Sequence, residues 1–397
     1  MSTVTTSTDE QAQRVADRAA KRERMRGLLE RAGARGVLLT SHEAVTWYLD
    51  GPRTHVSLAG PPVLAVAVHP ERDIVYAPRN EADRLIAEEL LPEDAEALVR
   101  VPWHEPLEQA ARRAAADAAP HATSAGDDAP MGAGHAALSE AGGALSLEAR
   151  HDGLLPEAEL AAELRAARAS LLPGELARYR ALGAETARAL GDVARAARPG
   201  DSERATAAEL HAALASRGID PLVALVAGAA RLPHRHPLPT GATLGDRAML
   251  VVCGRRHGLI ANATRWLTTS EADDEREARI RSVEAAYLDA TVPGATLDAV
   301  LAAGIAGYAA AGFDAEEWRQ HHQGGPTGYA GRDPRATPGA SDVVQERHAF
   351  AWNPSAPGCK VEDTVVAGSA GIEVLTVEPA WPTATTAGRD RPLPLRF

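Results

Sequence analysis

Two pairs of histidines are the side chains of this chain best suited to chemistry. His234 and His236 are separated by one arginine and enclosed by prolines, and His321 and His322 are adjacent. An imidazole titrates near neutral pH and can take up or release a proton as a bond forms or breaks. These residues therefore indicate proton-transfer chemistry. The competing interpretation is that one of the first pair is a surface turn residue and that His321 is a structural loop residue.

The composition limits the kinds of partner. The chain has 397 residues, enough for two domains of ordinary size, with 45% apolar and 24% charged residues. Its net charge is -12 and it has no basic stripe with interleaved aromatics, so no nucleic acid partner is expected. No apolar run approaches the ~20 residues of a membrane helix, and the start lacks an apolar signal-peptide core. We expect a cytoplasmic protein with no membrane partner. The two cysteines, Cys253 and Cys359, form no CxxC motif and no disulfide framework.

Strands alternate with helices in the first part of the chain. Strands are predicted at residues 36–40, 62–68 and 73–76, and helices at residues 9–32 and 81–91. This alternation is typical of a small α/β domain. Residues 110–143 are rich in Ala, Gly, Asp and His, which indicates a flexible insertion or a poorly ordered linker.

Helices and then strands dominate the rest of the chain. Helices are predicted at residues 156–170, 175–197, 202–218, 275–288 and 297–312. Strands are predicted at residues 249–252, 258–261, 349–352, 363–366 and 373–376. This segregation indicates an α+β domain. We expect a first domain over residues 1–155 and a second over residues 156–397.

Short motifs follow one another in a fixed order in the second domain. They are Arg198-Pro-Gly-Asp-Ser-Glu203, the first histidine pair before Gly245-Asp246, Ala263-Thr-Arg265, Gly325-Pro-Thr-Gly328, Trp352-Asn-Pro354, Lys360-Val-Glu-Asp363 and the run from Gly371 to Thr376. The ordered set resembles the "pita-bread" hydrolases of the creatinase and aminopeptidase P superfamily. Ser41-His-Glu-Ala-Val45 and Tyr48-Leu-Asp-Gly51 resemble the smaller domain of creatinase. The resemblance implies an α+β pita-bread domain preceded by a smaller α/β creatinase-type domain.

The resemblance also implies that a metal site has been lost. Metallopeptidases of this superfamily hold two divalent ions with two aspartates, one histidine and two glutamates, which suit hard cations. The first aspartate falls near Val251 or Cys253, and the second falls on Asn262. The histidine falls on Gly325 and the first glutamate on Asn353, so only Glu362 keeps its carboxylate. We therefore predict no metal ligands and no cofactor.

The remaining polar positions define a metal-free candidate site. The resemblance implies that His234 or His236 is the proton shuttle and that His321 is a second active-site histidine. Without a metal, Glu362 is expected either to orient water or to bind a guanidinium. The expected substrate-binding residues are His322, Arg332, Asn262, Asn353, Cys253, Arg265 and Arg53. Arg53 and His55 lie where creatinase-like domains reach into a neighbouring subunit.

Three of these assignments have structural alternatives. A structural ion pair is the favoured interpretation of Arg265, and a buried structural thiol is the favoured one for Cys253. Glu362 could form a salt bridge to Lys360 or to Arg265.

Three functions are compatible with these residues. The first is a metal-independent enzyme that hydrolyses, cleaves or rearranges a C–N bond in a small amide, amidine or amino-acid-derived molecule, as creatinase does without a metal. Creatine itself is not implied, because creatinase keeps a glutamate where this chain has Asn353. The second is a peptidase-like binding protein without catalysis, and the third is a metallopeptidase with unusual ligands. The expected partners are an anionic or zwitterionic small molecule and, by resemblance, a second copy of the chain in a homodimer.

Overall fold

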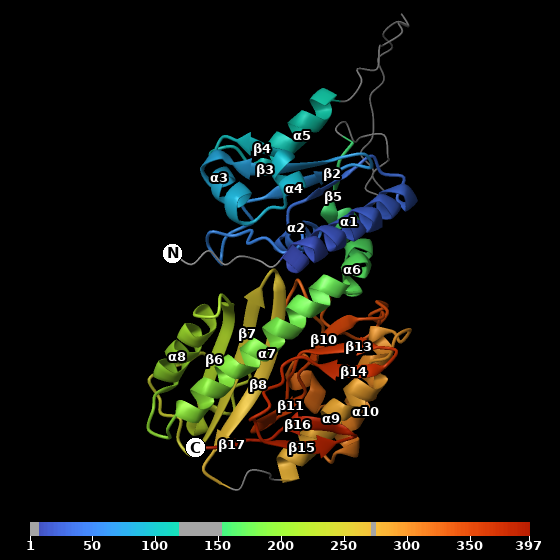
Figure 1. Cartoon of the computed structure of the whole chain (residues 1–397). Coiled ribbons are helices and arrows are strands. Elements are labelled where there is room, and N and C mark those ends of the chain that lie inside the picture. Colours follow the sequence, from blue (N-terminus) through green and yellow to red (C-terminus); the bar gives the residue numbers. More distant parts are fainter. Residues whose placement is uncertain (1–7, 119–152, 271–274) are drawn as a thin grey trace, which may run out of the picture. The chain divides into compact units, whose positions relative to one another are not determined.

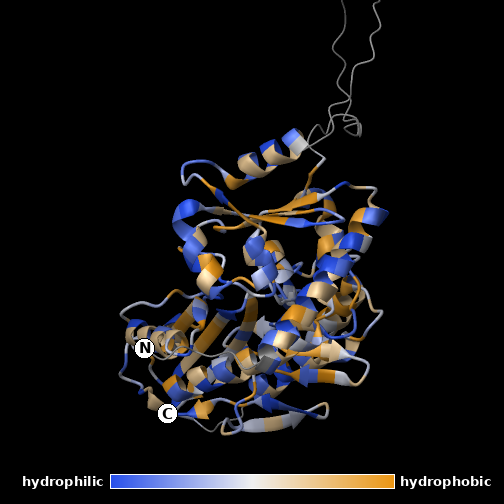
Figure 2. Cartoon of the chain, turned by 45° about the horizontal axis from the view of Figure 1, so that its top comes forward, coloured by the Kyte–Doolittle hydropathy of each residue, from blue (hydrophilic) through white to orange (hydrophobic). Residues whose placement is uncertain are grey.

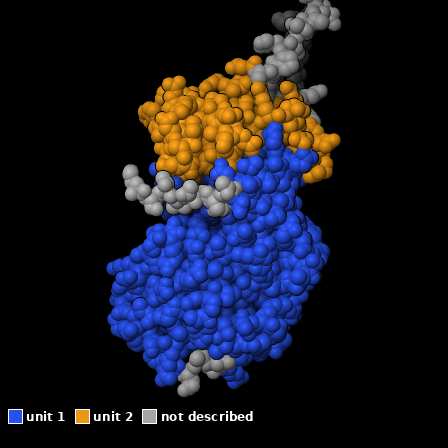
Figure 3. Space-filling model, in the orientation of Figure 1, with its two compact units in different colours: residues 1–24, 41–62, 161–397 blue, residues 25–40, 63–160 orange. Residues whose placement is uncertain are grey.

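The chain forms two compact units, drawn in different colours in Figure 3. The computed structural model describes residues 8–118, 153–270 and 275–397. The larger unit comprises residues 1–24, 41–62 and 161–397, and the smaller unit comprises residues 25–40 and 63–160. Helix α1 (Thr8–Arg31) contributes residues to both units. Within the described ranges, no helix is long and apolar enough to cross a membrane.

The smaller unit is built on a five-stranded sheet with the order β4-β3-β2-β1-β5. The central strands pair antiparallel, and β4 and β5 add at the two edges in parallel. Apolar residues of β2 alternate, so that Ala65 and Ala67 face a core with Leu38, Tyr76 and Ala111. Figure 2 shows apolar residues along this sheet. The elements are β1 (Val37–Leu39), β2 (Ala65–Val68), β3 (Asp73–Pro78), α3 (Arg79–Glu88), α4 (Pro92–Glu96), β4 (Leu98–Val101), α5 (Leu107–Ala118), β5 (Leu155–Pro156) and η2 (Glu157–Leu160).

The first half of the larger unit packs helices on a sheet with the order β17-β8-β7-β6. Helix α7 lies along β7 and β8 (Figure 1). Strands β7 and β8 pair without interruption from Arg247 opposite Thr268 to Arg256 opposite Leu259. His257 and Gly258 make the turn with φ angles of 52° and 76°, the pair of positive values that a two-residue hairpin favours. The elements are α2 (His42–Tyr48), α6 (Ala161–Ala169), α7 (Pro173–Ala196), α8 (Glu203–Ala215), β6 (Asp220–Gly228), η3 (Ala229–Arg231), β7 (Arg247–Arg256), β8 (Leu259–Thr268) and β17 (Leu395–Arg396).

The second half of the larger unit repeats the plan of two helices and a sheet, here with the order β14-β13-β10-β9. Its core contains Tyr287, Phe350 and Trp352, and the rings of Tyr287 and Trp352 stack 4.7 Å apart. Helices α9 and α10 approach closely because residue 304 is glycine: a Cβ there would lie 2.1 Å from the Tyr287 ring. The elements are α9 (Glu275–Ala290), α10 (Leu297–Ala310), η4 (Glu317–Gln320), β9 (Gly324–Pro326), β10 (His348–Trp352), β11 (Ser355–Ala356), β12 (Cys359–Lys360), β13 (Val365–Gly368), β14 (Gly371–Val374), β15 (Thr383–Thr386) and β16 (Arg389–Pro392).

The two four-stranded sheets of the larger unit meet at Asp363. Ala263 of β8 forms an isolated bridge with Asp363, and the backbone N–H of Thr264 donates to the carbonyl of Glu362 at 3.0 Å. The Asp363 carboxylate accepts hydrogen bonds from Arg391 at 2.7 Å and from Arg265 at 2.8 Å. This junction places the Glu362 side chain beside β8.

The α+β pita-bread architecture agrees with the sequence-based prediction, and the long helices begin and end within a few residues of their expected limits. One expectation was wrong: residues 110–118 continue the amphipathic helix α5 instead of starting a flexible segment. Residues 119–143 of that expected segment lie outside the described residues. The sequence reading also missed β6 and the hairpin of β15 and β16. The proposed boundary between residues 155 and 156 stays a prediction.

Candidate functional site

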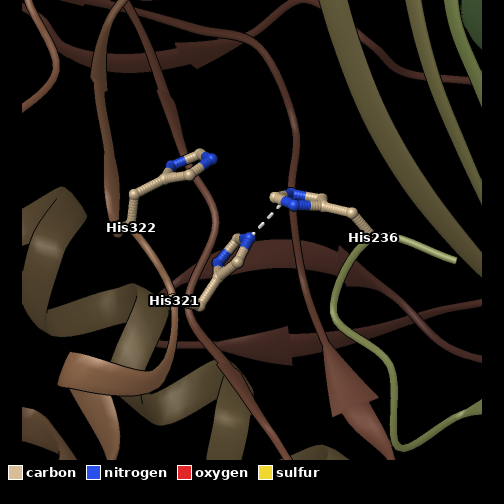
Figure 4. Close-up of side chains that lie close together, drawn as sticks. All are labelled: His236, His321 and His322. Carbon is tan, nitrogen blue, oxygen red and sulfur yellow. Dashed lines mark hydrogen bonds between the residues drawn. The ribbon is translucent and has the colours of Figure 1, made fainter.

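Three histidines converge in the larger unit, and we call them the histidine cluster: His236, His321 and His322 (Figure 4). His236 lies on the loop between η3 and β7, and the other two follow η4. One ring nitrogen from each lies within 4.8 Å of the others. The Nε2 atoms of His236 and His321 are hydrogen-bonded at 3.0 Å, and the rings of His321 and His322 stack 4.4 Å apart. His236 is exposed, whereas His321 is only 8% exposed.

Glu203 anchors the loop that carries His236. Its carboxylate is buried and accepts hydrogen bonds from the backbone N–H groups of Gly228 and Thr240, both at 2.9 Å. The hydroxyl of Thr240 donates to it at 2.7 Å, and Arg231 forms an ion pair with it. A carboxylate with this many donors fixes both ends of the loop.

Arg235 holds the loop next to the segment that carries the other two histidines. Its guanidinium pairs with Glu317, the first residue of η4, and donates to the Ser355 hydroxyl at 3.1 Å. Its neighbour His236 is thereby held against His321. His234, on the other side of Arg235, is exposed and belongs to no described cluster.

Gln323 fixes the backbone of the second segment. Its amide nitrogen donates to the carbonyls of His321 at 2.6 Å and Trp318 at 2.8 Å. Its amide oxygen accepts from the hydroxyls of Tyr308 at 2.8 Å and Tyr287 at 3.2 Å. A side chain with all these partners has one orientation, so His321 is presented from a rigid support.

Glu362 is enclosed by cations. Its carboxylate oxygens form ion pairs with Lys360 at 2.9 Å and with Arg332 at 2.7 Å, and they accept a hydrogen bond from the Thr264 hydroxyl at 2.9 Å. Burial alone would raise the pKa of this carboxyl, but Lys360 and Arg332 outweigh it and lower the pKa to about 2. Glu362 is therefore a fixed carboxylate at neutral pH. Of the two salt bridges considered from the sequence, the one to Lys360 is present, whereas Arg265 pairs with Asp363 instead.

Asn262 and Cys253 lie side by side next to this carboxylate. They are directly paired across β8 and β7, so their side chains project to the same face. The Asn262 amide oxygen accepts from Arg332 at 3.3 Å, and its nitrogen donates to the Thr327 hydroxyl at 3.2 Å. Burial raises the pKa of Cys253 to about 12 and keeps it a thiol, which disfavours a nucleophilic role.

The loop with Arg332 is held by a network of buried charges, the Lys21 network: Lys21, Asp50, Glu175, Arg178 and Tyr329. Lys21 pairs with Asp50 at 2.6 Å and with Glu175 at 2.8 Å, and Arg178 pairs with Asp50 at 2.8 Å. The hydroxyl of Tyr329, three residues before Arg332, donates to Glu175 at 2.6 Å. The network therefore connects the loop after β9, which carries Tyr329 and Arg332, to α1 and α7.

The histidines are neutral at physiological pH. Burial, with Lys360 next in size, lowers the pKa of His321 to about 2. Burial, followed by Arg332 and Arg335, lowers that of His322 to about 4. The pKa of His236 is lowered as well, first by partial burial and then by Lys360. Neutral imidazoles have a free lone pair, and the buried Nδ1 atoms of His321 and His322 have no hydrogen-bond partner among the described residues.

Comparisons with known proteins agree with this architecture. Residues 177–373 match Metallopeptidase family M24, a span that begins in α7 and includes the histidine cluster and Glu362. The chain belongs to the creatinase and aminopeptidase P superfamily. Among the curated proteins, none matches its sequence.

Solved structures share the fold of this superfamily member over most of its length. The dipeptidase PepE from Mycobacterium ulcerans is 19% identical with a TM-score of 0.67, over 92% of this chain and 96% of that one. The prolidase from Pyrococcus horikoshii is 14% identical with a TM-score of 0.67, over 90% and 98%. The N-terminal domain of a FACT complex subunit from Cicer arietinum (chickpea) is 12% identical with a TM-score of 0.59, over 91% and 97%.

The residues present do not fit the two-metal centre of the superfamily. Gly325 stands at the histidine position with a φ of 136°, and a Cβ there would lie 2.9 Å from the Pro334 carbonyl and the Ala336 nitrogen. Asn353 is buried, and its amide oxygen has no hydrogen-bond partner among the described residues. Glu362, the remaining carboxylate, is engaged by Lys360 and Arg332.

The sequence had left Val251 and Cys253 as alternatives for the first aspartate position. Both alternate on one face of β7, but Cys253 pairs with Asn262, whereas Val251 pairs with Thr264. Val251 packs in an apolar cluster with Leu225. The structure therefore favours Cys253 as the residue beside Asn262, and neither side chain supplies a carboxylate.

Of two further predicted substrate-binding residues, Arg265 has a structural role, and the assignment of Arg53 to a neighbouring subunit's site stays a prediction. Arg265 is buried and donates to Asp363 at 2.8 Å and to the Thr376 carbonyl at 2.8 Å, which matches its structural alternative. Arg53 is exposed on the segment after α2, and His55 from the same segment lies 3.4 Å from Asp220. The described partners of His55 are Asp220 and Arg255, which lie outside the histidine cluster.

Four residues of the site were missed from the sequence: Arg235, Glu317, Gln323 and Arg335. Arg335 is exposed and contributes to the lowered pKa of both His236 and His322, so its positive charge lies near the cluster. Arg235 could have been noticed because it separates the two histidines of the first pair. The other three carry no local signal, because their roles depend on contacts that only the fold creates.

Proposed function

We propose that this protein is an enzyme that hydrolyses or otherwise cleaves a C–N bond in a small amide, amidine or amino-acid-derived molecule without the two-metal centre of its superfamily. The state of Glu362 carries this proposal. Two side-chain cations, Lys360 and Arg332, occupy the oxygens that a pair of metal ions would require. The charge of this carboxylate is thus already balanced by the protein itself.

Histidines supply the proton chemistry in this proposal. His236 is exposed and neutral, so it has a lone pair, and its hydrogen bond to the buried His321 places its ring in the cluster. It takes a proton from a water molecule whose oxygen attacks the carbonyl or amidine carbon. It then returns that proton to the departing nitrogen as the C–N bond breaks. The guanidinium of Arg332 and the ammonium of Lys360 favour the negative charge that develops on the attacked group.

The charge around the cluster supports an anionic or zwitterionic substrate. In addition to burial, the positive charges of Lys360, Arg332 and Arg335 lower the pKa values of His236 and His322. The carboxylate of Glu362 has the opposite effect on His236. Arg335 has no ion pair or hydrogen bond among the described interactions, so its guanidinium is available to a ligand. A guanidinium suits a carboxylate in a two-point contact. We therefore assign Arg335 to the substrate carboxylate.

The test is turnover by protein treated with EDTA and freed of it by gel filtration. A panel of Xaa-Pro dipeptides, N-acyl amino acids, N-carbamoyl amino acids and guanidino acids is followed by mass spectrometry. We expect cleavage of at least one substrate class. His236→Ala should lower kcat about 10²- to 10⁴-fold. His234→Ala is the matched control and should leave kcat within about twofold, because that histidine lies outside the cluster.

Two outcomes contradict the proposal. Turnover that depends on added Mn²⁺ or Co²⁺ would support a metallopeptidase with unusual ligands. Equal kcat values for His236→Ala and the wild type would remove the cluster from the mechanism. Failure of the whole panel would favour the second candidate, a binding protein without catalysis. One observation supports that candidate: a structural neighbour is named as a subunit of a complex and not as a peptidase.

A further inference from the structure

We propose that the histidine cluster binds one divalent transition-metal ion, at a position distinct from the superfamily's carboxylate centre. The donors would be one ring nitrogen each from His236, His321 and His322. These atoms already lie within 4.8 Å of one another without any rearrangement of the backbone. None of the three stands at a position that the superfamily uses for its metal ligands.

The geometry requires only small side-chain movements. In a tetrahedral site with metal–nitrogen bonds of about 2.0–2.1 Å, ligand nitrogens lie roughly 3.4 Å apart. The His236 and His321 nitrogens are at 3.0 Å, and the widest separation in the cluster would shorten by roughly 1.4 Å. Because His236 is exposed, its ring can rotate and an exogenous ligand can reach a fourth position. The arrangement is that of an open three-histidine site.

The protonation states also suit a metal. Each imidazole must bind through a deprotonated nitrogen, and burial keeps all three neutral. If His321 binds the metal through Nε2, its ring proton lies on Nδ1. That Nδ1 atom is buried and has no hydrogen-bond partner among the described residues. Metal binding therefore replaces the hydrogen bond between His236 and His321 without the loss of any other described contact of these rings.

The surrounding charges decide which ions can bind. Lys360, Arg332 and Arg335 repel a dication, and Glu362 offsets only part of that charge. Hard ions such as Mg²⁺ and Mn²⁺ need anionic oxygens and should bind poorly. Zn²⁺, Ni²⁺ and Cu²⁺ form strong bonds to imidazole nitrogen and follow a steep order of affinity. We therefore assign the site to this second group.

Metal binding opposes the proposed reaction. The lone pairs that coordinate the ion are the ones that would accept the proton from water. A bound Zn²⁺ should therefore inhibit an enzyme that works by imidazole proton transfer. Binding itself does not depend on the proposed function, and the two can be tested separately.

The experiment is a titration of the EDTA-treated full chain with Zn²⁺ by calorimetry and with Co²⁺ by visible absorption. We expect one ion per chain, tetrahedral Co²⁺ bands and at least tenfold weaker binding of Mn²⁺. His236→Ala and His322→Ala should each weaken Zn²⁺ binding at least tenfold, whereas the control His234→Ala should bind like the wild type. Circular dichroism of each variant checks that the fold is kept.

Three results would overturn the metal site: no saturable binding, the same affinity in the double variant H236A/H322A, or Mn²⁺ binding as tight as Zn²⁺. Turnover distinguishes this outcome from failure of the proposed function. Zn²⁺ that binds and restores activity to inactive apoprotein would keep the site and refute metal-free catalysis. Activity without any saturable metal binding would keep the function and refute the site.

Discussion

The Lys21 network and the histidine cluster are two polar regions of the larger unit, and they differ in how their groups are paired. In the network, Lys21, Arg178 and two carboxylates pair at distances of 2.6–2.8 Å. In the cluster, two buried nitrogens of neutral rings have no partner among the described residues, whereas the two network atoms without a hydrogen bond, Asp50 Oδ2 and Arg178 Nε, belong to charged groups that are already paired. Opposite charges that neutralise one another hold elements together. Polar atoms without partners cost stability and are retained where they bind or react.

The largest effect should come from breaking the network. Lys21→Met leaves Asp50 and Glu175 with less compensation in a fully buried position. We expect the free energy of unfolding to fall by about 3–5 kcal/mol, measured by urea denaturation. Arg180→Met breaks the exposed pair with Glu373 and should cost no more than about 1 kcal/mol. A loss in Lys21→Met as small as that of this control would show that the network is not structural.

Acid should weaken the network next. Burial alone would raise the pKa of Asp50, but Lys21 and Arg178 outweigh it, so the pKa lies below the ordinary value of 3.8. The stability that Asp50 provides is complete above its unfolded pKa and is lost as the pH falls from about 4 through the lowered folded value. Denaturation between pH 5 and pH 2 should show this loss, and Asp50→Asn should show a shallower slope. Identical slopes would exclude Asp50 as a source of acid sensitivity.

A smaller effect is expected for Arg335, at the exposed edge of the cluster. Arg335→Ala should raise KM about tenfold, equivalent to about 1.4 kcal/mol, because the substrate carboxylate loses its guanidinium partner. Its stability should stay within about 0.5 kcal/mol of the wild type, since Arg335 is an exposed surface residue. Arg335→Lys should recover part of the affinity. An unchanged KM in both variants would remove this residue from substrate binding.

The smallest change in stability is expected inside the cluster itself. His322→Leu removes a buried nitrogen without a partner and should alter the free energy of unfolding by no more than about 1 kcal/mol, in either direction. Turnover and Zn²⁺ binding should nevertheless fall in the same variant. A loss comparable to that of Lys21→Met would mean that the cluster supports the fold, and the contrast between the two regions would disappear.

The elements were largely predictable because they rest on local periodicity. Helices such as α7 and α10 have long apolar patterns, and the ordered motifs by themselves indicate the pita-bread domain. Strand β6 was missed because its residues pair with β7 and carry no clear alternation of their own. Residues 110–118 of helix α5 were assigned to a flexible segment because alanine-rich composition obscured the amphipathic face of the helix.

The candidate site was predictable in residue type but not in detail. The choice between His234 and His236 depends on Arg235, which pairs with Glu317 and so brings His236 to His321, whereas His234 stays outside the cluster. Glu362 pairs with both Lys360 and Arg332, and Arg332 lies 30 positions before it in the sequence. Such contacts follow from the way two sheets join at Asp363, which no local pattern encodes.

Gly325 limits which side chains its loop can carry. A side chain at this position would collide with Pro334 and Ala336, and its backbone adopts a φ of 136° that other residues rarely adopt. Replacing this glycine by histidine would therefore strain the loop before any benefit from a metal could arise. An imidazole at residue 325 would therefore need the neighbouring turn to move first. In its present conformation this loop accepts only a residue without a side chain, so the imidazoles near Glu362 have to come from other segments.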